Sequence, residues 1–211
     1  MHTGVAARIA ARGDGGWVVR VRDRDVEARV VICAVPWHAI PDVLPDVPPL
    51  RSVRDAARDT PASPIVTVNL WFDRQVTPEA FVGLPGRRMQ WVFDKRRLFG
   101  GRSSHLSLVS SGAESIAART NQELVDLATS EVLAALPQAR AATLQRAVVV
   151  RERRATFSLA PGMPQRPGTR TALRDLLLAG DWIDTGLPAT IESAVVSGHR
   201  AADAAVAGQS A

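Results

Sequence analysis

Residues 176–203 constrain the fold of this chain more than any other segment. Residues 176–179 form a short, continuous apolar run that predicts a buried strand. Gly180 and Asp181 follow, and residues 188–206 have the periodicity of a helix, with one expected apolar face made of Ile191, Ala194, Val195, Ala202 and Ala205. A strand that leads through a glycine into a helix is typical of α/β proteins, which place ligands at this junction.

The residue types at this junction suit a polar ligand. Gly180 lets a ligand approach the backbone, and the Asp181 carboxylate can accept hydrogen bonds from sugar or polyol hydroxyls. The helix start at residues 189–191 exposes unpaired N–H groups, which suit an anion or an electron-rich carbonyl. A plain strand, turn and helix with a solvent-exposed aspartate remains the alternative.

The rest of the chain alternates between strand and helix patterns, which predicts a mixed α/β fold. Residues 17–22 alternate with a period of two, and residues 29–35 form a nearly continuous apolar run, typical of a strand buried on both faces. An antiparallel sheet is expected in the middle of the chain, and helices are expected near residues 50–58 and 112–136. The expected strands of that sheet are residues 65–72, 89–94 and a segment around 106–108.

Composition excludes several classes of protein. The 26 basic residues outnumber the 21 acidic ones, but the two signs are interleaved, so we expect a solvated surface of mixed sign and no nucleic-acid partner. Two locally positive segments, 87–97 and 151–154, keep an anionic surface as a hypothesis. The single cysteine, Cys33, excludes a disulfide framework and a cysteine-based zinc site, and no metal site is predicted.

The sequence shows neither a membrane-spanning segment nor a signal peptide. No apolar run approaches the roughly 20 residues that span a bilayer. The first residues, Met1-His2-Thr3-Gly4, lack the charged and apolar regions of a signal peptide. A cytoplasmic location is therefore expected.

Two motifs near the end of the chain carry a family resemblance. Gly180-Asp181-Trp182, with residues 185–192 (TGLPATIE), resembles the C-terminal flavin-binding segment of the flavin amine oxidase and phytoene desaturase superfamily. Within it the chain is most similar to the hydroxysqualene dehydroxylases, also described as squalene-associated FAD-dependent desaturases. Weaker internal segments fit that branch, namely residues 31–36, 63–74, 90–95 and 154–157.

The resemblance implies a partial FAD-binding Rossmann-like domain and an antiparallel-sheet substrate domain with helices. Residues 1–40 would form a β-meander and strand of the FAD-binding domain, 41–150 the substrate domain, and 151–211 the C-terminal strand and helix of the FAD-binding domain. The residues implied to bind FAD are Gly180, Asp181, Trp182, Pro188, Ala189, Thr190 and Ile191.

Individual roles follow from the same resemblance. Asp181 would contact the flavin ribityl or pyrophosphate region, and Thr190 and Ile191 would face the pyrimidine edge of the ring. A helix N-terminus stabilises the negative charge that gathers there on reduction. Ser193 departs from the family, which usually has glycine at this position.

A second departure is the missing phosphate motif. The superfamily carries GxGxxG near its N-terminus, and none occurs here, because residues 13–16 (GDGG) have the wrong pattern and precede a strand. The resemblance therefore implies the C-terminal part of a longer enzyme, either a fragment or one part of a split protein. The N-terminal half would then be supplied by another chain, and the chain alone should hold FAD poorly.

The implied activity is the reductive dehydroxylation of hydroxysqualene, a polyisoprenoid, to squalene in hopanoid biosynthesis. Trp71, Phe72, Trp91, Phe93 and Leu98-Phe99 could line an apolar cavity, and the last pair with the basic segments could contact the inner membrane peripherally. His105 and Asp94 are candidate acids, and no catalytic residue is assigned.

Two alternatives to this activity remain. One is a carotenoid (phytoene-type) desaturase or another flavin amine oxidase-family enzyme. Amine-oxidising relatives usually present a lysine near the flavin, and the strand at residues 65–72 has none, which weakens that branch. The other is a non-catalytic module that binds a lipid or a partner chain.

Overall fold

The structure, a computed structural model, describes residues 3–13, 15–100 and 104–209. Of the segments considered above, Met1, His2 and Asp14 lie outside the described residues. The chain forms two compact units, Met1–Pro61 with Phe157–Ala211 (unit 1) and Ala62–Thr156 (unit 2). These limits differ from the expected ones at residues 40 and 150, because residues 41–61 belong to unit 1 and residues 151–156 belong to unit 2. The roles expected of the two domains stay predictions.

Unit 1 contains an antiparallel sheet at its N-terminal end. Its strands are β1 (Ala7–Ala11), β2 (Trp17–Val21) and β3 (Arg24–Ala28), in the order β1-β2-β3. The sequence predicts only the middle strand, since β1 and β3 are rich in alanine and charged residues. The mixed α/β class is confirmed, and no helix within the described residues is long and apolar enough to cross a membrane.

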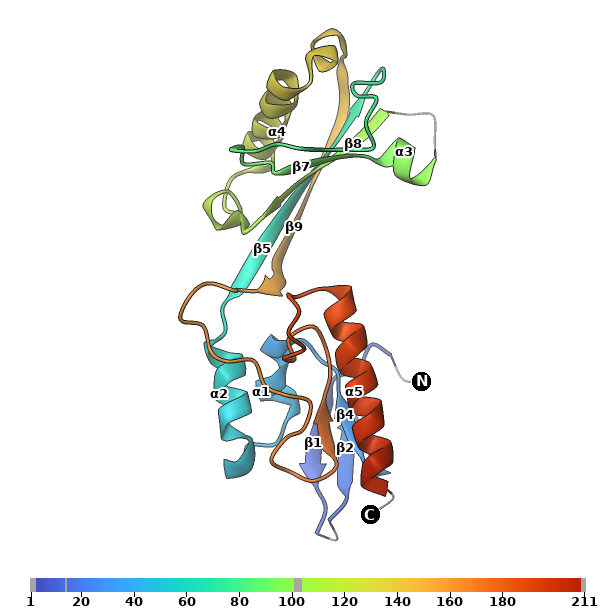
Figure 1. The fold of residues 1–211 in the computed structure, drawn as a ribbon, viewed down its shortest axis with the longest axis vertical. Helices are drawn as coiled ribbons and strands as arrows, with labels where there is room; N and C mark the ends of the chain where they lie inside the picture. Colours follow the sequence, from blue (N-terminus) through green and yellow to red (C-terminus); the bar gives the residue numbers. More distant parts are fainter. Residues whose placement is uncertain (1–2, 14, 101–103, 210–211) are drawn as a thin grey trace. The chain divides into compact units, whose positions relative to one another are not determined.

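A second sheet of unit 1 holds the junction singled out in the sequence. Strand β10 (Leu176–Leu178) pairs in parallel with β4 (Val31–Cys33), with Leu177 opposite Ile32. Helix α5 (Ile191–Gln209) packs against β10 (Figure 1). All three leucines of β10 are buried, as predicted. The expected burial of residues 29–35 on both faces is wrong, because the Ile32 side chain is 43% exposed.

Two short helices complete unit 1. Helix α1 (Ile40–Val43) precedes α2 (Arg51–Asp59), close to the helix predicted at residues 50–58. The buried Arg54 of α2 donates hydrogen bonds to the carbonyls of Pro41 and Leu44. A charged side chain inside the unit is stabilised in this way because its donors find acceptors at the end of α1.

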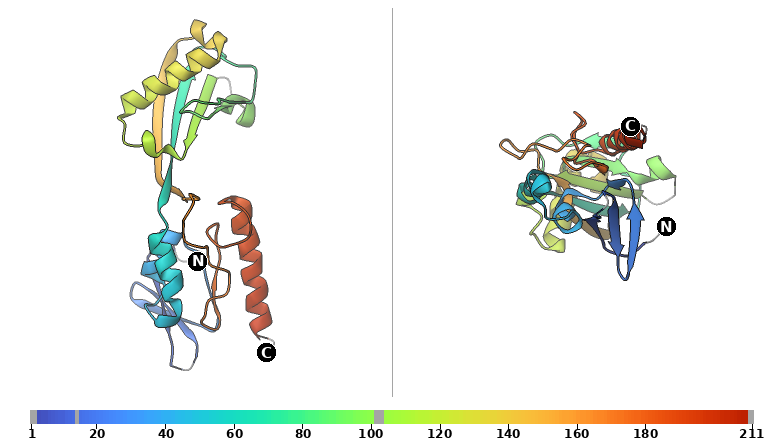
Figure 2. Two further views of the ribbon diagram at one scale, coloured as in Figure 1. Left: turned by 60° about the vertical axis from the view of Figure 1, so that its left-hand side comes forward. Right: turned by 90° about the horizontal axis from the view of Figure 1, so that it is seen from below.

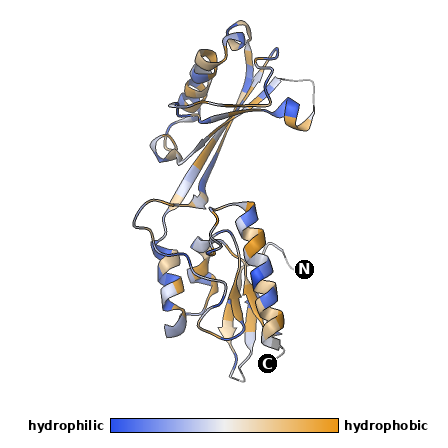
Figure 3. Ribbon diagram, viewed as in Figure 1, coloured by the Kyte–Doolittle hydropathy of each residue, from blue (hydrophilic) through white to orange (hydrophobic). Residues whose placement is uncertain are grey.

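The buried face of α5 differs from the predicted one. Ser193, Ser197 and Ala201, spaced four residues apart, are fully buried, whereas Ile191 and Val195 of the expected apolar face are exposed. Ala202 is exposed as well. Small side chains let the helix approach β10 closely, so packing distance rather than hydropathy decides its orientation. Figure 3 accordingly shows hydrophobic segments along α5 that are not confined to one side.

Unit 2 is built on one five-stranded sheet. Its order is β6-β7-β8-β5-β9, and the neighbouring pairs β6–β7, β7–β8 and β5–β8 are antiparallel. The elements are β5 (Ala62–Phe72), β6 (Phe81–Gly83), β7 (Trp91–Asp94), α3 (Lys95–Phe99), β8 (Ser104–Ser111), α4 (Asn121–Ala135) and β9 (Leu144–Phe157).

Helix α4 covers one face of this sheet (Figure 2). Leu124, Ala128 and Val132 of α4 pack on alternate residues of the central strands, such as Val68 and Leu108. A capping box starts the helix, since Thr120 and Glu123 satisfy each other's backbone N–H groups. The observed helix therefore begins at Asn121, later than the start predicted at residue 112.

Candidate functional site

The predicted cofactor residues lie on one continuous connection from β10 to α5. Gly180 begins it with φ +128°, a conformation that L side chains rarely adopt. Its N–H donates to Ser197 Oγ at 2.8 Å, and the Ser197 hydroxyl also lies 2.9 Å from the Gly180 carbonyl oxygen. The turn after β10 is thus fastened to the middle of α5.

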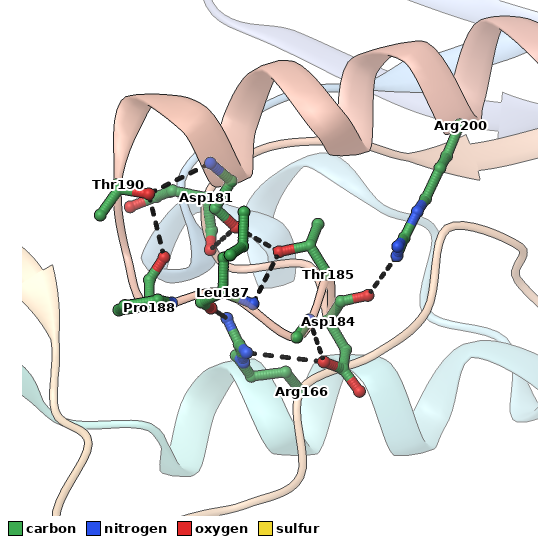
Figure 4. Close-up of polar contacts among 10 residues, drawn as sticks. Arg166, Asp181, Asp184, Thr185, Leu187, Pro188, Thr190 and Arg200 are labelled. Atoms are coloured by element: carbon green, nitrogen blue, oxygen red, sulfur yellow. Dashed lines mark hydrogen bonds and ion pairs between the residues drawn. The ribbon is translucent and has the colours of Figure 1, made fainter.

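A second link joins this connection to the first turn of α5 (Figure 4). Thr185 Oγ1 and Ser193 Oγ lie 2.7 Å apart, and the Ser193 hydroxyl is 3.4 Å from the Asp181 carbonyl oxygen. Ser193 is fully buried. Its hydroxymethyl group therefore turns into the connection and ties the loop to the helix.

Two arginines hold the middle of the loop around Asp184 (Figure 4). Arg166 donates to the Leu187 carbonyl at 2.9 Å and lies 3.5 Å from the Asp184 carboxylate. Arg200 of α5 donates to the Asp184 carbonyl at 3.1 Å. These contacts satisfy backbone groups that a loop of this length would otherwise leave to water. The path of residues 180–190 is therefore fixed from both sides.

The N-terminus of α5 is capped but keeps free donors. Thr190 Oγ1 accepts from the Ser193 N–H at 3.1 Å, as an N-cap residue does. No hydrogen bond among the described residues uses the N–H groups of Ile191 and Glu192. These two donors and the positive end of the helix dipole can stabilise an anionic or electron-rich group.

Trp182 lies inside unit 1, with 2% of its surface exposed. Within the part of the chain that the structure describes, its Nε1 has no hydrogen-bond partner. Trp182 lines a cavity of about 230 Å³ together with Phe157, Arg166 and Asp184. A buried indole N–H without an acceptor is unusual, because such groups normally find a partner.

The connection from β10 to α5 offers features that a flavin site would use. Gly180 offers backbone without a side chain, the half-buried Asp181 makes no side-chain ion pair among the described residues, and α5 directs free N–H groups outward. Pro188 and Ala189 shape the turn into α5. This set can hold polar hydroxyls and a reduced ring edge, but it supplies no glycine-rich phosphate cradle.

Unit 2 has an aromatic sheet face opposite α4. Trp91 and Phe93 of β7 lie on it with Phe81 of β6, and the three ring centroids are 6.3–6.4 Å apart. Phe81 and Trp91 are exposed. Phe72, expected to line an apolar cavity, is instead buried in the core beneath the other face of the sheet, because residues alternate between faces along β5.

A polar group interrupts this face where β5 and β8 meet. Trp71 and His105 lie opposite each other in the register and stack with centroids 4.2 Å apart and planes at 16°. His105 Nε2 is 2.9 Å from Asn69 Oδ1, and the Arg146 guanidinium lies 4.8 Å above the Trp71 ring. Burial lowers the pKa of His105, and Lys95 and Arg146 act in the same direction.

Asp94, the second candidate acid, has a structural role. It is buried, accepts from the Arg96 N–H as the N-cap of α3, and forms an ion pair with the Arg96 guanidinium at 3.0 Å. Both of its carboxylate oxygens therefore contact Arg96 of α3.

Comparison with known proteins assigns the family. The profile described as "Flavin containing amine oxidoreductase" matches residues 5–206. The chain belongs to this flavin-containing family. The predicted resemblance and the predicted flavin cofactor, FAD, are thereby supported, and the match covers both units.

Curated relatives of this family member include hydroxysqualene dehydroxylases. Those of Rhodopseudomonas palustris and Sinorhizobium fredii are 37% and 33% identical over 84% and 83% of the chain. A 15-cis-phytoene desaturase of Solanum lycopersicum is 28% identical over 68% of the chain. The chain spans 38% of the length of the two dehydroxylases.

Solved structures confirm the fold of the family. A triple mutant of putrescine oxidase matches 94% of the chain with a TM-score of 0.70 at 18% identity, and the match covers 48% of that protein. A protein from Exiguobacterium, described as a protoporphyrinogen oxidase, matches 98% of the chain with a TM-score of 0.66 at 13% identity, and the match covers 46% of that protein.

Sequence reasoning missed the residues that fasten the site. Ser193 and Ser197 stand four residues apart with Ala201, and this small-residue spacing is the signal that could have revealed the buried side of α5. Arg166 and Arg200 carry no such signal, since both are distant in sequence from the loop that they hold.

Proposed function

We propose that this chain is the C-terminal part of an FAD-dependent oxidoreductase that acts on a polyisoprenoid, and that its reaction is the reductive dehydroxylation of hydroxysqualene to squalene. The aromatic face of unit 2 carries this proposal on the structural side, because a long hydrocarbon substrate needs an apolar surface with few polar groups. Similarity to three hydroxysqualene dehydroxylases supports the choice of substrate.

The residues of the β10–α5 connection would hold the flavin. Asp181 would accept hydrogen bonds from its hydroxyls, and the free N–H groups of Ile191 and Glu192 would face its electron-rich ring edge. Trp182 would be a buried wall of the site. When bound and reduced, the flavin would supply a hydride to the carbon from which the protonated hydroxyl leaves as water. Phe81, the exposed aromatic of β6, would help to exclude water from the hydrocarbon.

A partner segment with the GxGxxG motif would complete the flavin site, on the same polypeptide or on another chain. Two unit 1 surfaces support this. Ile32 of the parallel pair is exposed, although parallel sheets are normally covered on both faces. The Ile191 side chain of α5 is 87% exposed and Val195 is exposed beside it. Both are apolar surfaces that a further part of a flavin domain would bury.

Co-expression tests this proposal. The chain is produced with the N-terminal part of the Rhodopseudomonas palustris dehydroxylase, which precedes the matched region. A yellow complex that retains flavin through gel filtration and converts hydroxysqualene to squalene with a chemical reductant is the expected result. A colourless, inactive pair would contradict the proposal. An Ile191→Asp variant, which places a charge on the exposed face, should weaken the pairing.

Desaturation of a carotenoid precursor is the second candidate, favoured by the similarity to 15-cis-phytoene desaturases. The same complex is incubated with phytoene and an electron acceptor. Formation of a more conjugated product, without any squalene from hydroxysqualene, would replace the first proposal by this one.

We also propose a cytoplasmic protein with a peripheral contact to the inner membrane through α3. Leu98 and Phe99 are exposed side by side, with Phe99 77% exposed, and Lys95 and Arg97 are basic neighbours. Exposed apolar side chains flanked by basic ones suit an anionic lipid surface.

Sedimentation with phosphatidylglycerol vesicles tests this contact. The double variant Leu98→Ser/Phe99→Ser should lower the bound fraction severalfold. Leu159→Ser, which removes another exposed leucine, is the matched control and should bind as the parent does. Equal losses in both variants would contradict a contact through α3.

A further inference from the structure

The imidazole of His105 occupies an unusual place on the aromatic face of unit 2. Trp71 stacks on it, and Trp91 and Phe93 of β7 lie on the same face with rings that suit a hydrocarbon. A polar ring costs free energy where an apolar ligand covers it, unless the ligand offers a hydrogen bond. The same position would be better filled by phenylalanine if the face bound only hydrocarbon.

The contacts of His105 leave one ring nitrogen available. Nε2 is 2.9 Å from Asn69 Oδ1, and a carbonyl oxygen accepts, so Nε2 carries the proton in this arrangement. Nδ1 is then a lone-pair acceptor, and no hydrogen bond among the described residues reaches it. Burial and the nearby charges of Lys95 and Arg146 lower the pKa of His105, which favours the neutral ring, although Asp94 acts in the opposite direction.

The orientation of the ring is fixed on two sides. Trp71 stacks on it from the neighbouring strand, and Asn69 Oδ1 accepts from its Nε2 edge. Arg146 in turn covers Trp71. A pre-oriented acceptor loses little entropy when a ligand binds, which makes it effective for recognition.

We propose that His105, positioned by Asn69 and Trp71, binds the hydroxyl of an isoprenoid alcohol and so makes unit 2 select alcohols over hydrocarbons of the same skeleton. The inference rests on the proposed function, because it names the group of the substrate that the aromatic face recognises. A substrate O–H donates to Nδ1, and the hydrocarbon chain lies on the aromatic rings. A desaturase substrate without a hydroxyl would leave Nδ1 unsatisfied.

Binding of two soluble probes to the full chain tests the inference. Geraniol, a ten-carbon allylic alcohol, is compared with 2,6-dimethyl-2,6-octadiene, which has the same skeleton without the hydroxyl. The expected preference for the alcohol is about tenfold in Kd, the size of one additional net hydrogen bond. His105→Phe should keep the affinity for the hydrocarbon and abolish the preference. His38→Phe, which changes a histidine beside Trp37 in unit 1, is the matched control and should retain it.

A spectroscopic readout separates binding from mere structural support. In protein with ¹⁵N-labelled histidine, geraniol should shift the Nδ1 resonance that is missing in His105→Phe, and the hydrocarbon should not. Equal binding of both probes by the parent chain, or a preference that survives in His105→Phe, would overturn this inference and leave the apolar-substrate proposal standing. If neither probe binds, both the inference and the substrate face of the proposed function fail.

Discussion

The hydroxyl of Ser197 spans both backbone polar atoms of Gly180, accepting from its N–H at 2.8 Å and lying 2.9 Å from its carbonyl oxygen. Ala194 O is a further acceptor at 2.8 Å. One side chain on α5 therefore fixes the turn at which β10 ends and the proposed flavin site begins.

Ser197→Ala should destabilise unit 1, because it leaves the Gly180 N–H without its acceptor in a partly buried setting. The expected loss is about 1–3 kcal/mol in the free energy of unfolding, measured by urea denaturation, with faster hydrogen exchange at the Gly180 amide. Ser130→Ala on the exposed side of α4 is the control, since Ser130 bonds only to its own helix. Equal small losses in both variants would show that the Ser197 link is unimportant.

Gly180→Ala should also destabilise unit 1, but for a conformational reason. A Cβ at this position would meet only Val35 O at 4.0 Å, so space is sufficient, and the cost comes from φ +128°. Strain of this kind costs about 1–3 kcal/mol. Thermal or urea unfolding measures it, and Gly168→Ala is the control, because Gly168 has no positive φ and no atom near its Cβ position. An unchanged stability for Gly180→Ala would refute the assigned backbone strain.

Glu131 of α4 supports the strand that carries the aromatic face. Its carboxylate oxygens accept from the N–H groups of Arg88 and Met89 at 3.0 and 2.8 Å. Glu131→Ala leaves both donors unpaired and should cost about 2–5 kcal/mol of unfolding free energy in unit 2. Glu131→Gln keeps one acceptor oxygen, so its unfolding free energy should lie between those of the parent chain and Glu131→Ala.

Asp126→Ala is the matched control for this experiment, because Asp126 is an exposed acid on the same helix. It should change the unfolding free energy by less than about 0.5 kcal/mol. A loss in Glu131→Ala no larger than in Asp126→Ala would mean that water satisfies the two N–H groups as well as the carboxylate does.

Local patterns predicted most elements, and three-dimensional pairing explains what they missed. The run of apolar leucines at residues 176–178 becomes a buried strand because it pairs with β4 and packs against α5. The side of α5 that is buried follows instead from how closely β10 must approach, so Ser193 and Ser197 displace Ile191 from the interior. Hydropathy alone does not indicate how closely α5 and β10 pack.

The candidate site likewise combines residues that are neighbours in the sequence with contacts that only strand pairing creates. The residues from Gly180 to Ile191 lie together in the structure because they are nearly contiguous in sequence. The stacking of Trp71 on His105 depends on the register between β5 and β8, which no single strand encodes. Alternation along β5 shows which residues share a face of the sheet, but not which of the two faces is buried. The helix that buries the face of Phe72 is α4, about 50 residues later in the chain, so the strand by itself does not predict that Phe72 is buried.

The pH dependence of stability provides a final test of the His105 environment. Burial, followed by the charge of Lys95, lowers the pKa of His105 from its ordinary value of 6.5, and Arg146 acts in the same direction against Asp94. The unfolded chain therefore binds a proton at this histidine at a higher pH than the folded one does. Stability should be complete above pH 6.5 and should fall as the pH drops from 6.5 towards the lower folded pKa.

Urea denaturation of unit 2 between pH 7.5 and 5.5 measures this effect. His105→Phe, which keeps a ring for Trp71 to stack on, should reduce the slope of the unfolding free energy against pH, because the group whose protonation differs between the two states is gone. His199→Phe on the exposed surface of α5 should leave that slope unchanged. If the parent and His105→Phe lose stability equally over this range, the pKa of His105 is the same in the folded protein as in the unfolded chain, and the lowered pKa assigned to it is wrong.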